Sequence, residues 1–191
     1  IIAICFSLLF VMLAWFMLPK FLEQPKYKVV RKENDIEIRK YDKILTSSVK
    51  VYGDQYTSLR KGFQPLVRYI GAKERDSEKI SMTAPVIQTT NDESENWTVS
   101  FAMPSKYNID NLPKPANDEI YFEEIQPSLA AVIRFSGVAD TSLLTRKASV
   151  LKRWLELNGY TESSSPKFLF YNDPTTPGFL RRNEVMIIID K

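Results

Sequence analysis

Two segments of this chain, 84 residues apart, share one pattern of apolar and polar positions. Residues 36–53 read IEIRKYDKILTSSVKVYG and residues 120–137 read IYFEEIQPSLAAVIRFSG, so the two align without a gap and both end on glycine. The alternation within each segment is typical of strands that are buried on one face. Because a repeated unit buries its apolar face against its own copy, the pattern predicts one domain with two similar halves.

Each half is predicted to contain two strands, a helix and two further strands. The expected strands lie at 27–32, before the repeated segment, then at 36–41, 45–52, 80–88 and 97–103 in the first half, and within 120–137 and at 167–171 and 184–190 in the second. The first helix is expected at 56–70. At the same offset the helices align as well, with Leu66 on Val150. Chance similarity between two amphipathic units is the alternative to a true duplication.

Two helices cannot cover a sheet of about eight strands. The strands are therefore expected to curl, which predicts an α+β fold: a distorted antiparallel β-barrel, flanked by two helices and built from a duplicated ββαββ unit. The space between the curved sheet and the helices is the expected pocket.

The N-terminal segment is apolar throughout. Residues 1–18 carry no charge, and Ser7 is their only polar side chain. As a helix they would extend roughly 27 Å, close to the ~30 Å hydrocarbon core of a bilayer. We therefore predict a single-pass transmembrane anchor at 1–18, a linker at 19–26 and a folded domain at 27–191, located at a membrane that is also a partner. A cleaved signal is the alternative, and the side of the membrane is left open.

The chain contains no histidine and only one cysteine, Cys5. This composition excludes Ser-His-Asp and Cys-His catalysis, histidine-containing zinc sites, haem held by a proximal histidine and an intrachain disulfide. The neighbours Glu123 and Glu124 point to opposite faces of a strand and so form no acid–base pair. The net charge of +3 is spread along the chain and leaves no nucleic-acid footprint. We predict no catalytic residues, no metal ligands and no nucleic-acid partner.

Six short strings follow one another between residue 27 and the end of the chain. They are IEIRKY, GFQPLVRYIG, KISMTAPV, WTVSFAMP, VIRFSG and YNDPTTPGFLRRNEVMII. In these strings the chain resembles the SOUL haem-binding proteins, also called the haem-binding protein 1 family, and MTAPV and RRNEV are distinctive. The resemblance implies an internally duplicated, distorted β-barrel with two helices. It also implies non-catalytic binding of haem or another porphyrin, for tetrapyrrole transport, buffering or sensing.

The resemblance places the ligand in an apolar cleft beside the first helix. Phe63, Leu66 and Val67 match the apolar wall of the family's haem-contacting segment. Arg60 and Arg68 match basic positions proposed to meet the propionates. The chemistry is suitable, because a porphyrin needs a flat apolar surface and a guanidinium can pair bidentately with a carboxylate. The alternative is that the apolar residues form the core-facing stripe of the helix and the arginines its solvated edge.

No histidine is present to serve as an axial ligand of haem iron. Methionine and tyrosine can also hold iron, but nothing in the sequence selects Met82, Met103, Tyr56 or Tyr69 for this role. Binding would then rest on apolar contact and propionate pairing, with about micromolar affinity, roughly −8 kcal/mol. Residues Thr175 and Thr176, which precede RRNEV, provide no basic side chain that could close the ligand cleft.

Other interpretations of the same residues stay open. The duplicated plan also resembles the effector-binding domains of bacterial multidrug-responsive regulators, which hold apolar or cationic small molecules, and a buried carboxylate such as Glu123 or Glu124 would favour that class. An enzyme that uses carboxylates and tyrosines alone has no supporting constellation here. Residues 181–184 (RRNE) predict a turn into the last strand with Glu184 paired inside the protein, and anion binding is the alternative.

Overall fold

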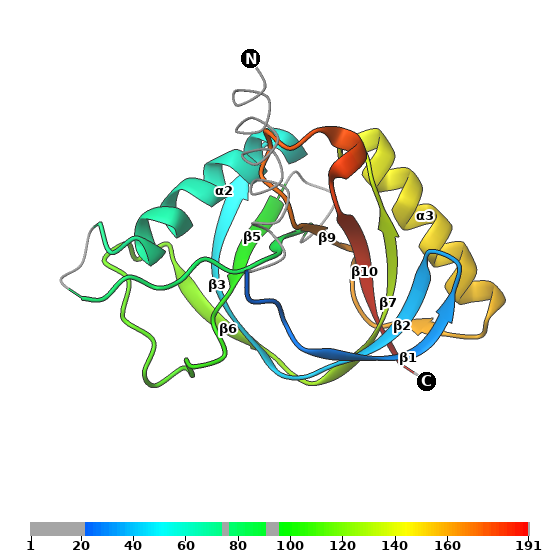
Figure 1. Cartoon of the computed structure of the whole chain (residues 1–191), viewed down its shortest axis with the longest axis horizontal. Coiled ribbons are helices and arrows are strands. Elements are labelled where there is room, and N and C mark those ends of the chain that lie inside the picture. The colour runs from blue at the N-terminus through cyan, green and yellow to red at the C-terminus, as the bar shows by residue number, and fades with distance from the viewer. Residues whose placement is uncertain (1–21, 74–76, 91–95, 191) are drawn as a thin grey trace, which may run out of the picture.

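The computed structural model describes residues 22–73, 77–90 and 96–190, and within them one sheet carries two helices (Figure 1). In chain order the elements are β1 (Tyr27–Glu33), β2 (Ile36–Tyr41), β3 (Ile44–Tyr52), α2 (Gln55–Ile70), β4 (Val86–Thr90), β5 (Asn96–Ala102), β6 (Tyr121–Ile125), β7 (Ser128–Phe135), α3 (Thr141–Leu157), β8 (Thr161–Glu162), β9 (Lys167–Phe170), the 3₁₀ turn η1 (Gly178–Leu180) and β10 (Asn183–Asp190). The strand pairs within the sheet are antiparallel. The sheet curls into an open barrel with both helices on its outer side, which confirms the predicted fold class.

The order of the strands shows the duplication. Neighbouring strands run β1-β2-β7-β10-β9-β4-β5-β3-β6, and β8 pairs with β10. Strands β2, β3, β4 and β5 of the first half correspond to β6, β7, β9 and β10 of the second half. When each strand is replaced by its counterpart, the order from β2 to β6 is obtained in reverse. The two halves are therefore related by a pseudo-two-fold axis that passes between the central strands β4 and β9.

The glycine at the end of each repeated segment has the same backbone conformation. Gly53 has a φ of 124° and Gly137 a φ of 120°, values that residues with a side chain rarely adopt. In each half a helix follows, and its N-cap aspartate, Asp54 or Asp140, accepts a hydrogen bond from a backbone N–H of the first turn. The aspartates are 86 residues apart, so the second half has two additional residues between its glycine and its helix.

The predicted alignment of the two helices is therefore wrong by two residues. It places Leu66 on Val150, but Leu66 is fully buried whereas Val150 is 47% exposed. At an offset of 86 residues three buried pairs line up instead: Ser58 with Leu144, Gly62 with Ala148, and Tyr69 with Leu155. The two-residue insertion follows the repeated segment, so the strands of that segment keep an offset of 84 residues whereas the helices have an offset of 86.

Strand β4 begins later than the sequence predicts. A strand is expected at 80–88, but β4 starts at Val86, directly after Pro85. Proline has no N–H to donate to a ladder, and pairing therefore begins after it. Before the proline, Thr83 forms a single bridge with Glu23, and its hydroxyl donates to the carbonyl of Ala102. These contacts attach the N-terminal part of the described chain to the sheet.

Apolar layers fill the space between the sheet and each helix. The layer under α3 is built with β2, β7, β9 and β10, and the layer under α2 with β3 and β5. Gly62 brings α2 close to β5, since a Cβ atom there would lie only 2.6 Å from the side chain of Val99. A third apolar cluster lies on the inner, concave face of the sheet, away from both helices.

The predicted membrane location is not supported. Helices α2 and α3 contain 16 and 17 residues, and each has one apolar face and one charged face. Among the residues that the structure describes, no helix is long and apolar enough to cross a membrane. This finding overturns the prediction of a single-pass membrane protein with the membrane as a partner. The segment predicted as the anchor, 1–18, lies outside the described residues.

Candidate functional site

Three of the predicted porphyrin contacts lie along one side of α2. Phe63 is 38% exposed, and its ring packs edge-on against Phe101 of β5 with the centroids 5.3 Å apart. Val67, one turn later, is half-buried at the margin of the core. Arg60, one turn before Phe63, is exposed, and its guanidinium lies 6.0 Å from the centroid of the Tyr56 ring. Arg60, Phe63 and Val67 together are called the α2 strip.

The other two predicted contacts lie outside this strip. Leu66 is fully buried in the apolar layer under α2, so it belongs to the core as the alternative interpretation holds. Arg68 is exposed, and at 100° per residue it lies about 80° around the helix from Arg60. By the same arithmetic Arg60 lies about 60° and Arg68 about 140° from Phe63, so Arg60 is the arginine beside a flat ligand laid on Phe63.

Three of the four side chains considered as iron ligands pack in the apolar layer under α2 or at its margin. Tyr69 is buried, and its hydroxyl donates to the carbonyl of Pro113 at 2.7 Å. Met103 is buried in the same layer, and Met82 packs at its margin. Tyr56, the fourth of these side chains, is 68% exposed and lies beside Arg60, next to the strip.

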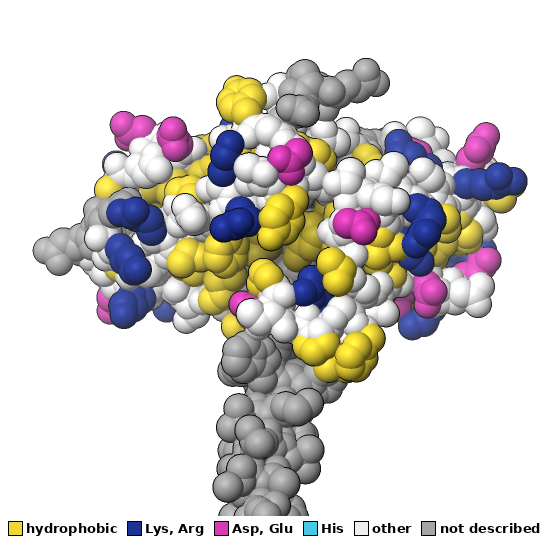
Figure 2. All heavy atoms as spheres, turned by 90° about the horizontal axis from the view of Figure 1, so that it is seen from above, with side chains coloured by type: hydrophobic (Ala, Val, Ile, Leu, Met, Phe, Trp, Pro, Cys, Tyr) yellow, Lys and Arg dark blue, Asp and Glu magenta, His cyan; other side chains and the backbone are white. Residues whose placement is uncertain are grey.

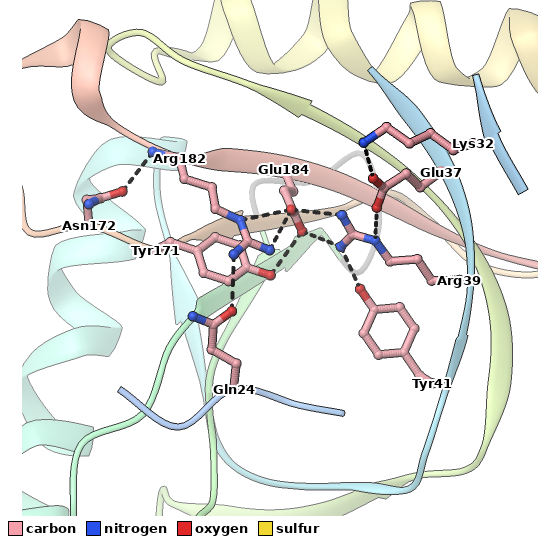
Figure 3. Close-up of polar contacts among 9 residues, drawn as sticks. All are labelled: Gln24, Lys32, Glu37, Arg39, Tyr41, Tyr171, Asn172, Arg182 and Glu184. Carbon is pink, nitrogen blue, oxygen red and sulfur yellow. Dashed lines mark hydrogen bonds and ion pairs between the residues drawn. The ribbon is translucent and has the colours of Figure 1, made fainter. Parts of the chain in front are cut away.

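A buried cluster of charged side chains lies on the concave side of the sheet (Figure 3). The side chains of Arg39 on β2 and Glu184 on β10 are 2% and 0% exposed. Two guanidinium nitrogens of Arg39 donate to the two carboxylate oxygens of Glu184, at 2.8 and 3.1 Å. The guanidinium also donates to Glu37 at 2.8 Å and to the hydroxyl of Tyr41 at 3.0 Å. Since β7 separates β2 from β10, this bidentate pair links two strands that are not neighbours.

Arg182 completes this charge cluster. Its Nε and Nη2 atoms donate to Oε1 of Glu184 at 3.0 and 2.8 Å, and its guanidinium lies 3.7 Å from the centroid of the Tyr171 ring. The Tyr171 hydroxyl donates to the other oxygen of Glu184 at 2.9 Å. Arg182 Nη1 donates to Gln24 at 3.1 Å, which ties the N-terminal part of the described chain to the residue that precedes β10.

Two of the six strings therefore meet in space. Arg39 comes from IEIRKY, and Arg182 and Glu184 come from RRNEV. The structure confirms that Glu184 is paired inside the protein and identifies its main partner as Arg39. Sequence reasoning missed this partner because an arginine on an alternating strand reads as exposed. The available signal was that Glu37, Arg39 and Tyr41 share one face of their strand.

Pairing decides the protonation of the carboxylates in the cluster. Burial raises the pKa of Glu184, but the hydrogen bonds and charges of Arg39 and Arg182 outweigh it and hold the pKa below its ordinary value. Burial also raises the pKa of Glu37, and Lys32 and Arg39 likewise bring it below the ordinary value. A carboxylate with a lowered pKa contributes stability above its ordinary pKa and loses that contribution as the pH falls.

A loss of stability at alkaline pH is expected from Tyr41. Burial raises the pKa of this hydroxyl from 10.0 to about 12, although Arg39 opposes the rise. The folded protein then holds the proton more tightly than the unfolded chain, so the free energy of unfolding falls as the pH rises from 10 towards 12. The Tyr41 contribution to this fall is on the order of 2 kcal/mol. Urea unfolding at several pH values should show a shallower decline for Tyr41→Phe than for the unchanged protein, and equal slopes would contradict the expectation.

A cavity of about 380 Å³ opens on the concave face, and Glu123 is among its lining residues. The neighbouring Glu124 points to the other face of β6, where its carboxylate accepts a hydrogen bond from Lys43 at 2.8 Å. The two glutamates thus face opposite sides, as predicted. Glu123 shares the cavity with Lys50 and Lys167, so the carboxylate is not the only charge there.

The match to known families covers almost all of the described chain. A family model described as "SOUL heme-binding protein" matches residues 22–188. This chain belongs to the SOUL heme-binding protein family. Heme-binding protein 1 of Xenopus laevis is 29% identical to it over 158 residues, which are 80% of this chain and 82% of that protein.

Solved structures share the fold of this SOUL protein at low sequence identity. The C-terminal domain of EcmrR superposes with a TM-score of 0.63 at 16% identity, covering 86% of this chain and 98% of that one. A hydrolase from Listeria innocua superposes with a TM-score of 0.60 at 9% identity, covering 84% and 94%. Such identities show the fold alone. In the SOUL protein this fold places the α2 strip and the inner cavity on opposite faces of one sheet.

Proposed function

We propose that this SOUL protein binds haem or another porphyrin on the α2 strip, without catalysing a reaction. The observation that carries the proposal is the exposed ring of Phe63, which lies beside Arg60 on an outer helix of a chain in this family. An apolar ring laid on Phe63 and Val67 would be removed from water on that side, and a propionate would lie within reach of Arg60.

The shape of the strip supports reversible binding. Arg60 and Phe63 are exposed, and two cavities of about 240 and 380 Å³ have no lining residue from α2, so a porphyrin at the strip would lie on a surface. Figure 2 shows the upper end of the molecule, where hydrophobic side chains gather across the middle with lysines and arginines among them. A ligand held on a surface and without a histidine ligand is expected to bind with about micromolar affinity. Such binding suits transport, buffering or sensing, in which the ligand must leave again.

The test is a titration of hemin into the full chain, followed at the Soret band. A saturable shift with a dissociation constant of about micromolar is expected. The double variant Arg60→Glu with Arg68→Glu should weaken binding about tenfold or more, because two carboxylates would then repel the propionates, and tenfold corresponds to about 1.4 kcal/mol. Metal-free protoporphyrin IX should bind with an affinity close to that of hemin.

A matched control is available on the other helix. Arg146 and Arg153 of α3 are both exposed, and the double variant Arg146→Glu with Arg153→Glu makes the same change of charge away from the strip. This variant should bind hemin as the unchanged protein does. The absence of a saturable shift, or an equal loss of affinity in both double variants, would exclude the strip as the site.

A further inference from the structure

The inner face of the SOUL domain holds a cavity that the porphyrin proposal does not use. Its volume of about 380 Å³ lies within the range of pockets for small ligands. It opens among β3, β4, β5, β6 and β9. Hydroxyl and ammonium groups dominate its lining, which includes Thr46, Thr89, Thr98, Ser100, Lys50 and Lys167.

Four of these residues form one row across the sheet. Lys167 of β9 is in register with Thr89 of β4. Thr89 is in register with Thr98 of β5, which in turn is in register with Lys50 of β3. Neighbouring strands lie about 4.8 Å apart, so the Cα atoms of the two lysines are separated by about 14 Å. Lysine side chains that extend from the two ends of this row can both reach a ligand lying over the threonines.

The floor of the cavity is polar although it is buried. Thr46, Thr98 and Ser100 are all buried. The hydroxyl of Ser48 donates to that of Ser100 at 2.7 Å and lies 3.3 Å from that of Thr46. A structural core would bury apolar side chains here, because burying a hydroxyl costs free energy unless it is hydrogen-bonded. Hydroxyls can both donate and accept, so this floor can adapt to a polar ligand.

Neither of the two lysines forms an ion pair with another described residue. The ion pairs within the described part of the chain involve neither Lys50 nor Lys167. Burial lowers the pKa of Lys167, and the charge of Glu123 opposes this without forming an ion pair. A partly dehydrated ammonium without a partner is stabilised by an anion placed beside it.

We propose that this cavity binds a small oxyanion, whose carboxylate or phosphate group lies over Thr89 and Thr98 between Lys50 and Lys167. Glu123, on the same lining, can accept a hydrogen bond from a ligand that also carries a hydroxyl group, as citrate does. The site is separate from the α2 strip, because the sheet lies between them. An apolar cation is disfavoured, since two lysines face one glutamate and Glu124 points away to Lys43.

The test uses the full chain with citrate and, separately, inorganic pyrophosphate. Isothermal titration calorimetry should show saturable binding of at least one, and NMR should show shifted side-chain signals of Lys50 and Lys167. Binding of citrate alone would specify carboxylates, and binding of pyrophosphate alone would specify phosphates. The double variant Lys50→Gln with Lys167→Gln should lose at least tenfold in affinity.

The control is Lys40→Gln, which removes an exposed strand lysine outside the cavity and should leave affinity unchanged. A second variant pair, Thr89→Val with Thr98→Val, keeps both charges and should also weaken binding. The proposal is overturned if neither anion binds, if the double lysine variant binds as well as Lys40→Gln, or if choline binds more tightly than both anions. Hemin binding should be the same in the double lysine variant, which separates this site from the α2 strip.

Discussion

Replacing Glu184 by glutamine is expected to lower the free energy of unfolding by about 3–5 kcal/mol. Glutamine keeps the shape of the side chain but removes the buried charge that Arg39 and Arg182 share, and Arg39 keeps only its ion pair with the partly buried Glu37. Losing the main partner of a buried charge is far more costly than losing a surface pair, because water cannot take the place of that partner. Urea unfolding followed by circular dichroism measures this change.

A surface pair provides the matched control for this prediction. Lys152 and Glu162 form an ion pair at 2.7 Å in which both side chains are partly exposed, so Glu162→Gln should change the stability by no more than about 1 kcal/mol. The double variant Arg39→Gln with Glu184→Gln should cost less than the sum of the two single changes, because it removes both charges of the pair. Additive effects, or a loss for Glu184→Gln as small as that of the control, would show that the pair is not coupled.

Replacing Leu66 by alanine is expected to lower the free energy of unfolding by about 2–5 kcal/mol. Leu66 is fully buried in the layer under α2, and its truncation leaves a cavity that the close approach of α2 to β5 cannot fill. Thermal and urea unfolding measure the loss. Hemin affinity, measured where the variant is still folded, should be nearly unchanged because Leu66 does not reach the surface.

Val150 is the matched control, because the 84-residue alignment places it on Leu66 but the structure leaves it 47% exposed. Val150→Ala should change the stability by less than about 0.5 kcal/mol. If Leu66→Ala reduced hemin affinity about tenfold and left the stability unchanged, Leu66 would be a wall of the ligand site rather than part of the core.

The repeat predicted the element order and the fold class because its signals are local. Alternation, the helical spacing at 56–70 and the glycine at the end of each segment depend on nearby residues alone, and Gly53 and Gly137 have almost the same φ. The offset between the helices was not predictable in this way. Two additional residues after Gly137 move the second helix without breaking its amphipathic pattern, so Leu66 and Val150 look equivalent in the sequence and differ in burial.

For the candidate sites too, the sequence indicated one part and the tertiary structure decided another. Resemblance to the SOUL family indicated α2 as the helix that contacts the ligand. Which of its residues lie in the core and which on the surface depends on how α2 packs on the sheet. Gly62 sets that close docking against Val99, which buries Leu66 and leaves Phe63 partly exposed. The inner cavity had no signal in the sequence, because Lys50 and Lys167 are 117 positions apart along the chain and meet only through strand register.

By itself the sequence determined the two-fold repeat, the absence of histidine chemistry and the family strings from which porphyrin binding is proposed. These depend on residue identity and short-range spacing. Only the tertiary structure decided that Arg39 is the partner of Glu184, that Leu66 belongs to the core, and that two lysines face one cavity. The reason is that burial and pairing across strands depend on which elements become neighbours, and in this sheet β2, β7 and β10 come together from distant parts of the chain.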